Sequence, residues 1–315
     1  MLKSFVAASC FVSLVACVQQ DKAPDELERA LPQAETVQIK LPQPARSADA
    51  RSADARTIGQ LATWYVATRD VTRTFNGGTG WVLVLLHTIV QFPVTTVHDN
   101  TYTWGPWSES LDPAEYKLDV HALADGTYTY QLSGRSKTQA GAAFHVVIDG
   151  KADPRKGDLQ GNGQFLLDFD ASRAVNPVDA GDARGTMDVN YDLATRHLDL
   201  TIMSTDALGQ PALADYAYNA AADGAGDMVF ALTGNAGGGP ALESSTLRSR
   251  WQADGQGRAD GRIGGGDLGA VQATASECWG KTFQRVYYTD SVGFAATEGD
   301  PASCVFTTAS APQGN

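Results

Sequence analysis

The strongest constraint on the fold of this chain is a period of two in its apolar residues from Tyr116 onward. In the segment 116–121, tyrosine, leucine and valine alternate with lysine, aspartate and histidine, and the segments 187–192 and 198–202 repeat the alternation of apolar and polar residues. Because successive side chains of a β-strand point to opposite faces, these segments predict a sheet with one dry face and one wet, acidic face. The dry face then needs a cover from elsewhere in the chain.

Alternating or β-branched runs of this kind number about twelve along the chain. They are 116–121, 128–132, 142–148, 163–169, 187–192, 198–202, 215–219, 228–232, 246–252, 257–263, 270–276 and 282–289. Most are joined by short segments rich in glycine and aspartate, so neighbours in sequence can pair as hairpins. We therefore predict a mainly β domain over 94–315, an antiparallel meander of about twelve strands that forms a barrel or half-barrel. Two stacked sheets are the alternative.

A cover for the dry face is predicted just before the first alternating segment. Residues 57–75 carry apolar side chains at helical spacing, and the segment 76–80 (Asn-Gly-Gly-Thr-Gly) is expected to break that helix. Residues 81–92 form an almost uninterrupted apolar run, whose length favours a helix although its β-branched residues also permit a strand. The run is too short to span a bilayer, which takes about 20 residues. The sequence therefore predicts a helical hairpin over 57–93 that packs on the sheet.

The start of the chain has the features of a secretory signal. Lys3 precedes an uncharged, mostly apolar segment over 4–15. This segment ends in Leu14-Val15-Ala16-Cys17, which resembles the lipobox of bacterial lipoproteins, where a small residue precedes the cysteine that receives diacylglycerol. The resemblance covers only the start of the chain, and no family motif is found in the rest.

The resemblance implies that 1–16 is a lipoprotein signal peptide and that Cys17, carrying acyl chains such as palmitate, anchors the protein in a membrane of the cell envelope. Val18 stands where an aspartate would signal retention in the inner membrane, which favours the outer membrane and leaves open whether the protein faces the periplasm or the surface. Residues 17–56 are predicted to form a flexible tether, because prolines and a five-residue repeat over 45–54 interrupt regular structure. Such a tether has a root-mean-square span of about 35 Å.

Besides the lipidated Cys17, two cysteines remain in the exported chain, Cys278 and Cys304. In an oxidising compartment they predict one disulfide. A closed loop of this size stabilises a fold by roughly 3.5 kcal/mol in the chain-entropy model. Free or metal-binding thiols are the alternative, which is disfavoured because neither cysteine has a histidine nearby in the sequence.

The charge of the chain and the motifs it lacks argue against several classes of function. The net charge is −12 and no basic cluster is present, which argues against nucleic acid as a partner. No Gly-x-Ser-x-Gly elbow, phosphate loop or dinucleotide fingerprint occurs, and the five histidines lie far apart. We therefore assign no catalytic residue, metal or cofactor. Asp-Gly pairs at 125, 149, 223, 254 and 260 are interpreted as hairpin turns, with calcium loops as the less favoured alternative.

Aromatic residues suggest where an apolar ligand could bind. Trp104-Gly105-Pro106-Trp107 would form a ligand platform if exposed and a plug for the end of the sheet if buried, and burial is favoured. The candidate ligand-contacting residues are Trp81, Leu85, Ile89, Trp104 and Trp107.

These features together lead us to expect a non-enzymatic, membrane-anchored envelope lipoprotein that binds an apolar ligand or lipid in a curved sheet. In outline this resembles periplasmic carriers of lipids and lipoproteins, in which helices cover a half-barrel. The alternative is a structural or surface lipoprotein with a filled core that contacts a protein partner. An architecture alone does not decide between the two.

Overall fold

The structure is a computed structural model that describes residues 24–25, 57–157, 160–178, 184–205, 209–235 and 239–311. The predicted signal peptide, the lipidation site Cys17 and most of the predicted tether lie outside the described residues. In the helix α3 (Thr63–Val90), the description of 76–81, 83 and 84 is limited to the backbone.

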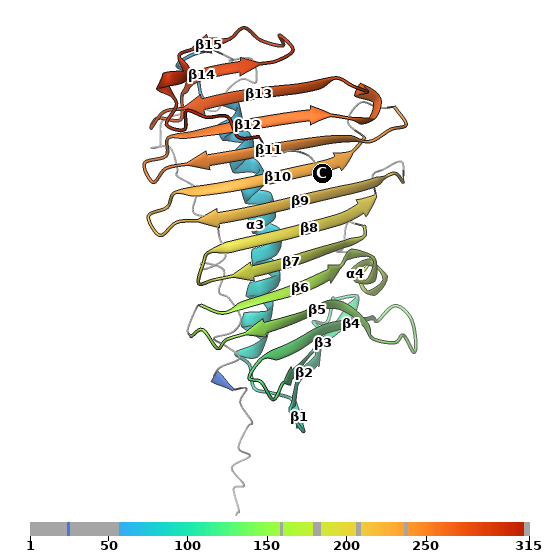
Figure 1. Cartoon of the computed structure of the whole chain (residues 1–315). Coiled ribbons are helices and arrows are strands. Elements are labelled where there is room, and N and C mark those ends of the chain that lie inside the picture. The colour runs from blue at the N-terminus through green and yellow to red at the C-terminus, as the bar shows by residue number, and fades with distance from the viewer. Residues whose placement is uncertain are drawn as a thin grey trace, which may run out of the picture.

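One open antiparallel sheet of fifteen strands makes up most of the molecule, and its strands follow one another in chain order (Figure 1). The strands are β1 (Thr96–His98), β2 (Thr101–Trp107), β3 (Ala114–Ala122), β4 (Tyr128–Ser136), β5 (His145–Asp153), β6 (Asn162–Asp168), β7 (Thr186–Asp192), β8 (His197–Thr205), β9 (Pro211–Ala220), β10 (Gly226–Gly234), β11 (Glu243–Trp251), β12 (Gly257–Gly264), β13 (Gln272–Trp279), β14 (Arg285–Asp290) and β15 (Glu298–Gly299). Short helices α4 (Phe169–Val175), η1 (Gly266–Leu268) and η2 (Pro301–Ser303) lie in the connections.

The predicted fold class is confirmed, with a half-barrel rather than a closed barrel. The twelve predicted segments correspond to β3 through β14, and each strand pairs with its sequence neighbours. The sequence analysis missed β1, β2 and β15. The edge strands β1 and β15 pair with one neighbour each in the described part of the chain, so the sheet stays open.

The predicted helical hairpin is wrong, because α3 is a single helix of 28 residues whose backbone continues through 76–80. It runs across the strands along the length of the sheet (Figure 1). A glycine inside a helix costs about 1 kcal/mol relative to alanine, which burial on both sides can offset. Phe75 stacks on Tyr216 before the glycine segment, and Val82 and Leu86 are fully buried after it. A straight helix about 42 Å long covers more strands than a folded hairpin could.

The sheet is one-sided, as the alternation predicts. Inward-facing residues of successive strands, such as Leu118, Phe165 and Leu200, join one buried cluster with Val82 and Leu86 of α3. The opposite face carries polar pairs between neighbouring strands, listed here as Thr103 with Asp119, Gln131 with Asp149, and Thr201 with Asp215. The apolar part of the predicted hairpin therefore does cover the dry face, as one half of a longer helix.

The Asp-Gly pairs divide into two groups. Gly126, Gly224 and Gly255 have positive φ angles of 81°, 95° and 90° in the hairpin turns before β4, β10 and β12. The pairs at 149–150 and 260–261 lie inside β5 and β12, so the turn interpretation is wrong for those two.

The connections between strands gather on two rims of the sheet. One, the turn rim, holds 99–100, 123–127, 154–157, 160–161, 193–196, 221–225, 252–256 and 280–284. The other, the loop rim, holds 108–113, 137–144, 169–178, 184–185, 209–210, 235, 239–242, 265–271 and 291–297, including α4 on the right of Figure 1.

Candidate functional site

An apolar pocket of about 440 Å³ lies where the chain leaves α3 and enters the sheet. We call it the β2 pocket, and its lining residues are Ile89, Phe92, Pro93, Thr95, Trp104, Gly105, Pro106 and Trp107. Trp107 ends β2 at the loop rim, so the pocket lies on that side of the sheet.

Hydrogen bonds fix the walls of the β2 pocket. Trp104 is buried, and its indole Nε1 donates to the backbone oxygen of Phe92 at 2.9 Å. The backbone nitrogen of Gly105 donates to Oγ1 of Thr95 at 3.0 Å. The pairing of β2 with β3 shifts register between Trp104 and Trp107, so the regular pattern of hydrogen bonds between the two strands is interrupted there. The segment after α3 is thereby held against the end of β2.

Three of the five predicted ligand-contacting residues line this pocket, namely Ile89, Trp104 and Trp107. Leu85 is partly buried against the main core instead, and the side chain of Trp81 lies outside the described residues. Burial of Trp104, favoured from the sequence, is found. Phe92 and Thr95 were missed, and the signal for Phe92 was its position as the last aromatic residue before the helix-ending Pro93.

A second apolar pocket of about 440 Å³ lies at the opposite end of α3, over β11 to β14. We call it the Trp64 pocket, and Leu247, Ile263, Ala273 and Val292 are among its other lining residues. Trp64 is held there because the buried carboxylate of Glu277 accepts hydrogen bonds from the backbone nitrogens of Thr63 and Trp64.

A third pocket, polar and of about 370 Å³, lies on the turn rim. Both of its acidic residues, Asp153 and Asp192, are already paired with basic side chains. Arg155 holds the pKa of Asp153 at about 2 through a side-chain hydrogen bond, and Lys156 lies 2.6 Å from Asp192. Because these charges already have partners within the protein, few remain to bind a ligand. This pocket is therefore a weaker candidate binding site than the two apolar pockets.

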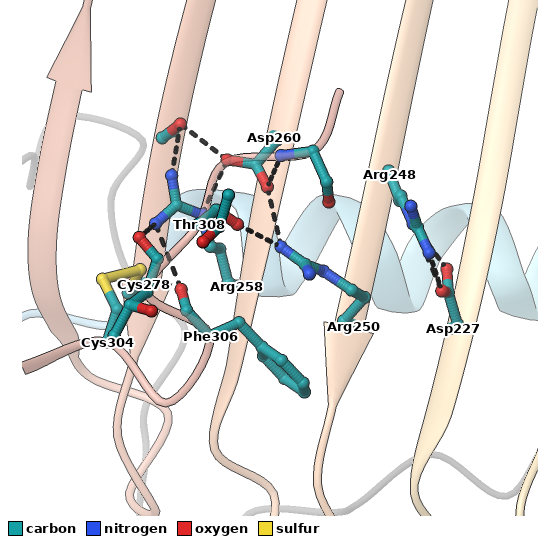
Figure 2. Close-up of polar contacts among 12 residues, drawn as sticks. Asp227, Arg248, Arg250, Arg258, Asp260, Cys278, Cys304, Phe306 and Thr308 are labelled. Carbon is teal, nitrogen blue, oxygen red and sulfur yellow. Dashed lines mark hydrogen bonds and ion pairs between the residues drawn. A yellow bond between two sulfur atoms is a disulfide. The ribbon is translucent and has the colours of Figure 1, made fainter. Parts of the chain in front are cut away.

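Charged residues are also buried on the outer face, at β11 to β13 (Figure 2). Arg258 and Asp260 are 3% and 1% exposed, and Arg258 Nε donates to Asp260 Oδ1 at 2.7 Å. Ser276 donates to the same carboxylate oxygen at 2.6 Å. Arg250 lies 3.3 Å from the other oxygen, and partial burial lowers its pKa.

The C-terminal tail covers this cluster. The Cys278–Cys304 disulfide, with a sulfur–sulfur distance of 2.10 Å, starts the tail beside β13 and confirms the predicted pairing (Figure 2). Arg258 then donates to the carbonyl of Phe306 at 3.2 Å, and Arg250 to that of Thr308 at 2.8 Å. The cluster therefore acts as a fastening for the tail. The sequence signal for it is the spacing of two between Arg258 and Asp260, which places both side chains on the same face of β12.

Neither a metal centre nor a membrane-spanning helix is apparent within the described ranges. No group of three or more histidine, cysteine, aspartate or glutamate side chains there is placed to hold a metal ion. Across the same part of the chain, no helix combines the length and apolar character that crossing a bilayer requires. Comparison with known protein families, with curated proteins and with solved structures gave no match to this chain.

Proposed function

We propose that this chain is a non-enzymatic, lipid-anchored protein of the cell envelope that binds an apolar ligand or lipid in the β2 pocket. The anchor is proposed from the resemblance of Leu14-Val15-Ala16-Cys17 to a lipobox, and the outer membrane from Val18. Neither a nucleic acid nor a cofactor forms part of this proposal.

The observation that carries the proposal is the apolar cavity of about 440 Å³ between α3 and the curved sheet. Small-molecule sites typically measure roughly 300–1,000 Å³ and are lined mainly by apolar and aromatic side chains. The N–H of Trp104 is already bonded to Phe92, so its ring offers the pocket apolar surface. Phe92 is 63% exposed, which leaves an aromatic ring on the surface beside the pocket. These features favour an acyl chain or another apolar group over a polar ligand.

A filled interior favours the second candidate, a structural or interaction lipoprotein. Val82 and Leu86 are fully buried against the sheet, so α3 occupies the space that a ligand would take in an empty half-barrel. Under this candidate the β2 pocket would stay empty.

The two candidates differ in whether lipid accompanies the protein. The mature chain 17–315 with Cys17→Ala, purified without detergent, would be examined by native mass spectrometry and titrated with a fluorescent fatty acid. We expect co-purified lipid and saturable binding of the probe. Absence of both would rule out the apolar-ligand proposal and leave the interaction protein.

Variants locate the binding site. Trp107→Ala and Phe92→Ser remove apolar surface from the β2 pocket, so each should weaken probe binding at least about tenfold, given the apolar area lost. Ile58→Ser is the control, because Ile58 is 47% exposed and lies outside the pocket. Equal affinities in all three variants would place the ligand elsewhere.

A further inference from the structure

Exposed apolar side chains concentrate on the loop rim. Leu111 is 97% exposed, Val178 73%, Val271 57% and Val292 56%, and each lies in a different connection on this rim. These connections join strands from β2 to β15, so the exposed side chains are spread along the length of the sheet. At about 4.8 Å per strand, the rim is about 65 Å long.

On the turn rim, by contrast, large apolar side chains in the described connections are buried or partly buried. Leu193 and Phe283 lie in two of its turns, and they are only 8% and 4% exposed. None of the large apolar side chains that are exposed in the described residues lies in a connection of this rim. Exposure of large apolar side chains is therefore a property of the loop rim and not of every connection in the described chain.

Both apolar pockets also lie toward the loop rim. Gly105–Trp107 of the β2 pocket end β2 there, and Ile263, Ala273 and Val292 of the Trp64 pocket lie at strand ends or in a loop on the same rim. The polar pocket, lined by Asp153, Asp192 and His197, lies at the turn rim. The molecule thus has an apolar side and a polar side in the plane of its sheet.

We propose that the loop rim docks on the surface of the lipid bilayer, with its loop tips inserted in the interfacial region. The inference rests on the proposed function, because the anchor at Cys17 keeps the domain within tether range of a membrane. A span of about 35 Å for this tether gives the rim a high effective concentration at the bilayer. Since the net charge is −12, anionic headgroups would not attract the domain, and apolar contacts must supply the attraction.

The spacing of the tips favours a bilayer over a protein partner. A protein interface has a contiguous buried core surrounded by a polar rim. Here the exposed apolar side chains lie in four separate loops along about 65 Å of sheet edge, and only the loop 291–297 carries two of them, Val292 and Phe294. A fluid bilayer surface accepts separate insertion points of this kind. Docking in this orientation also turns both apolar pockets toward the lipid, so a ligand can move between membrane and pocket with little contact with water.

The test measures vesicle binding without the acyl anchor. The mature chain with Cys17→Ala is titrated with phosphatidylcholine vesicles and sedimented, in parallel with a rim variant carrying Leu111→Ser, Val271→Ser and Val292→Ser. Ile58→Ser with Val97→Ser is the matched control, because these residues are 47% and 40% exposed and lie outside the loop-rim connections. We expect the rim variant to lose at least about tenfold in partition coefficient and the control to stay within about twofold.

Other results of the vesicle experiment would overturn the docking proposal, the anchor or both. If the acyl-free chain does not sediment while the natural acylated chain does, the docking proposal is overturned and the anchor stands. Failure of both chains to bind vesicles would overturn the anchor as well. Equal losses in the rim and control variants, or a rim variant that changes only self-association, would also overturn docking.

Hydrogen exchange on vesicles is a second measurement that needs no substitution. It should show slower exchange at 108–113, 265–271 and 291–297 and unchanged exchange at 221–225 and 252–256. Uniform protection of both rims would contradict the proposed orientation.

Discussion

Glu277 on β13 caps the first turn of α3, with its Oε1 3.2 Å from the backbone nitrogen of Thr63. The N-cap residue Ala62 has no side chain able to make this bond, so a residue 214 positions from Thr63 supplies it. Glu277 also accepts a hydrogen bond from Arg285 Nε at 2.5 Å, and burial raises its pKa. One carboxylate therefore joins the helix, β13 and β14.

Removing this carboxylate should strongly destabilise the fold. Glu277→Ala leaves the guanidinium of Arg285, which is 2% exposed, short of its main partner and uncaps the helix. Breaking a buried ion pair on one side costs about 3–5 kcal/mol in free energy of unfolding. Urea denaturation measures this loss, and Glu277→Gln, which keeps an oxygen acceptor, should lose less. Wild-type stability in Glu277→Ala would contradict the capping role.

Close approach of helix and sheet makes Gly261 sensitive to the smallest substitution. A Cβ at this position would lie 2.4 Å from Cη2 of Trp64, so Gly261→Ala must displace the Trp64 ring or the start of α3 that carries it. Overpacking of this kind costs about 1–3 kcal/mol. Thermal denaturation should show a lower Tm for Gly261→Ala, whereas Gly234→Ala on β10, where no atom lies within 4 Å of the new Cβ, serves as the control. Equal Tm values would show that Trp64 moves aside without cost.

Local sequence patterns were sufficient for the strands β3 to β14 because their period of two is a property of each segment alone. The missed strands keep this alternation over four residues or fewer, which is too short to be recognised. β2 contains Gly105 and Pro106, and β15 has only two residues. Both depend on neighbouring strands for their conformation, and a short segment read by itself does not contain that information.

The continuity of α3 and the tail fastening depend on distant residues. The glycines at 77, 78 and 80 weaken the helix locally, while the packing of Phe75 on Tyr216 of β9 and Phe230 of β10 supports it from far along the chain. The pairing of Cys278 with Cys304 followed from counting cysteines, but the return of the tail over Arg258 did not. In the candidate site, Ile89 of the apolar run and the tryptophans Trp104 and Trp107 could be predicted from the sequence. That these residues line the same pocket could not.

Loss of the disulfide should free the tail and expose the buried charges under it. In the variant with Cys278→Ala and Cys304→Ala, the free energy of unfolding should fall by about 3.5 kcal/mol. Exchange of the amides at 304–311, including that of Ser310, which donates to Asp260 at 3.1 Å, should accelerate. Asp227→Asn is the control, since its pair with Arg248 is about one-third exposed and should contribute at most about 1 kcal/mol. An unchanged exchange rate at 304–311 would mean that Arg250 and Arg258 hold the tail without the disulfide.

His197 on the polar face should titrate above an ordinary histidine. Burial alone lowers the pKa of His197, but hydrogen bonds to Asn219 at 2.7 Å and Asp199 at 2.5 Å, with the Asp199 charge, raise it overall. Both ring nitrogens face oxygen acceptors, which favours the doubly protonated ring. Because the folded pKa lies above the unfolded value of about 6.5, the resulting stability is fully present below that value and is lost as the pH rises through the folded pKa.

NMR titration of the imidazole measures this pKa directly. Asp199→Asn removes the charge beside Nε2, so the pKa of His197 should fall, and the loss of stability with rising pH should become smaller. Asp188→Asn on β7 is the control, because Asp188 bonds to Asn190 at 3.0 Å rather than to the histidine. A His197 pKa that is the same in wild type and Asp199→Asn would show that the carboxylate does not stabilise the charged ring.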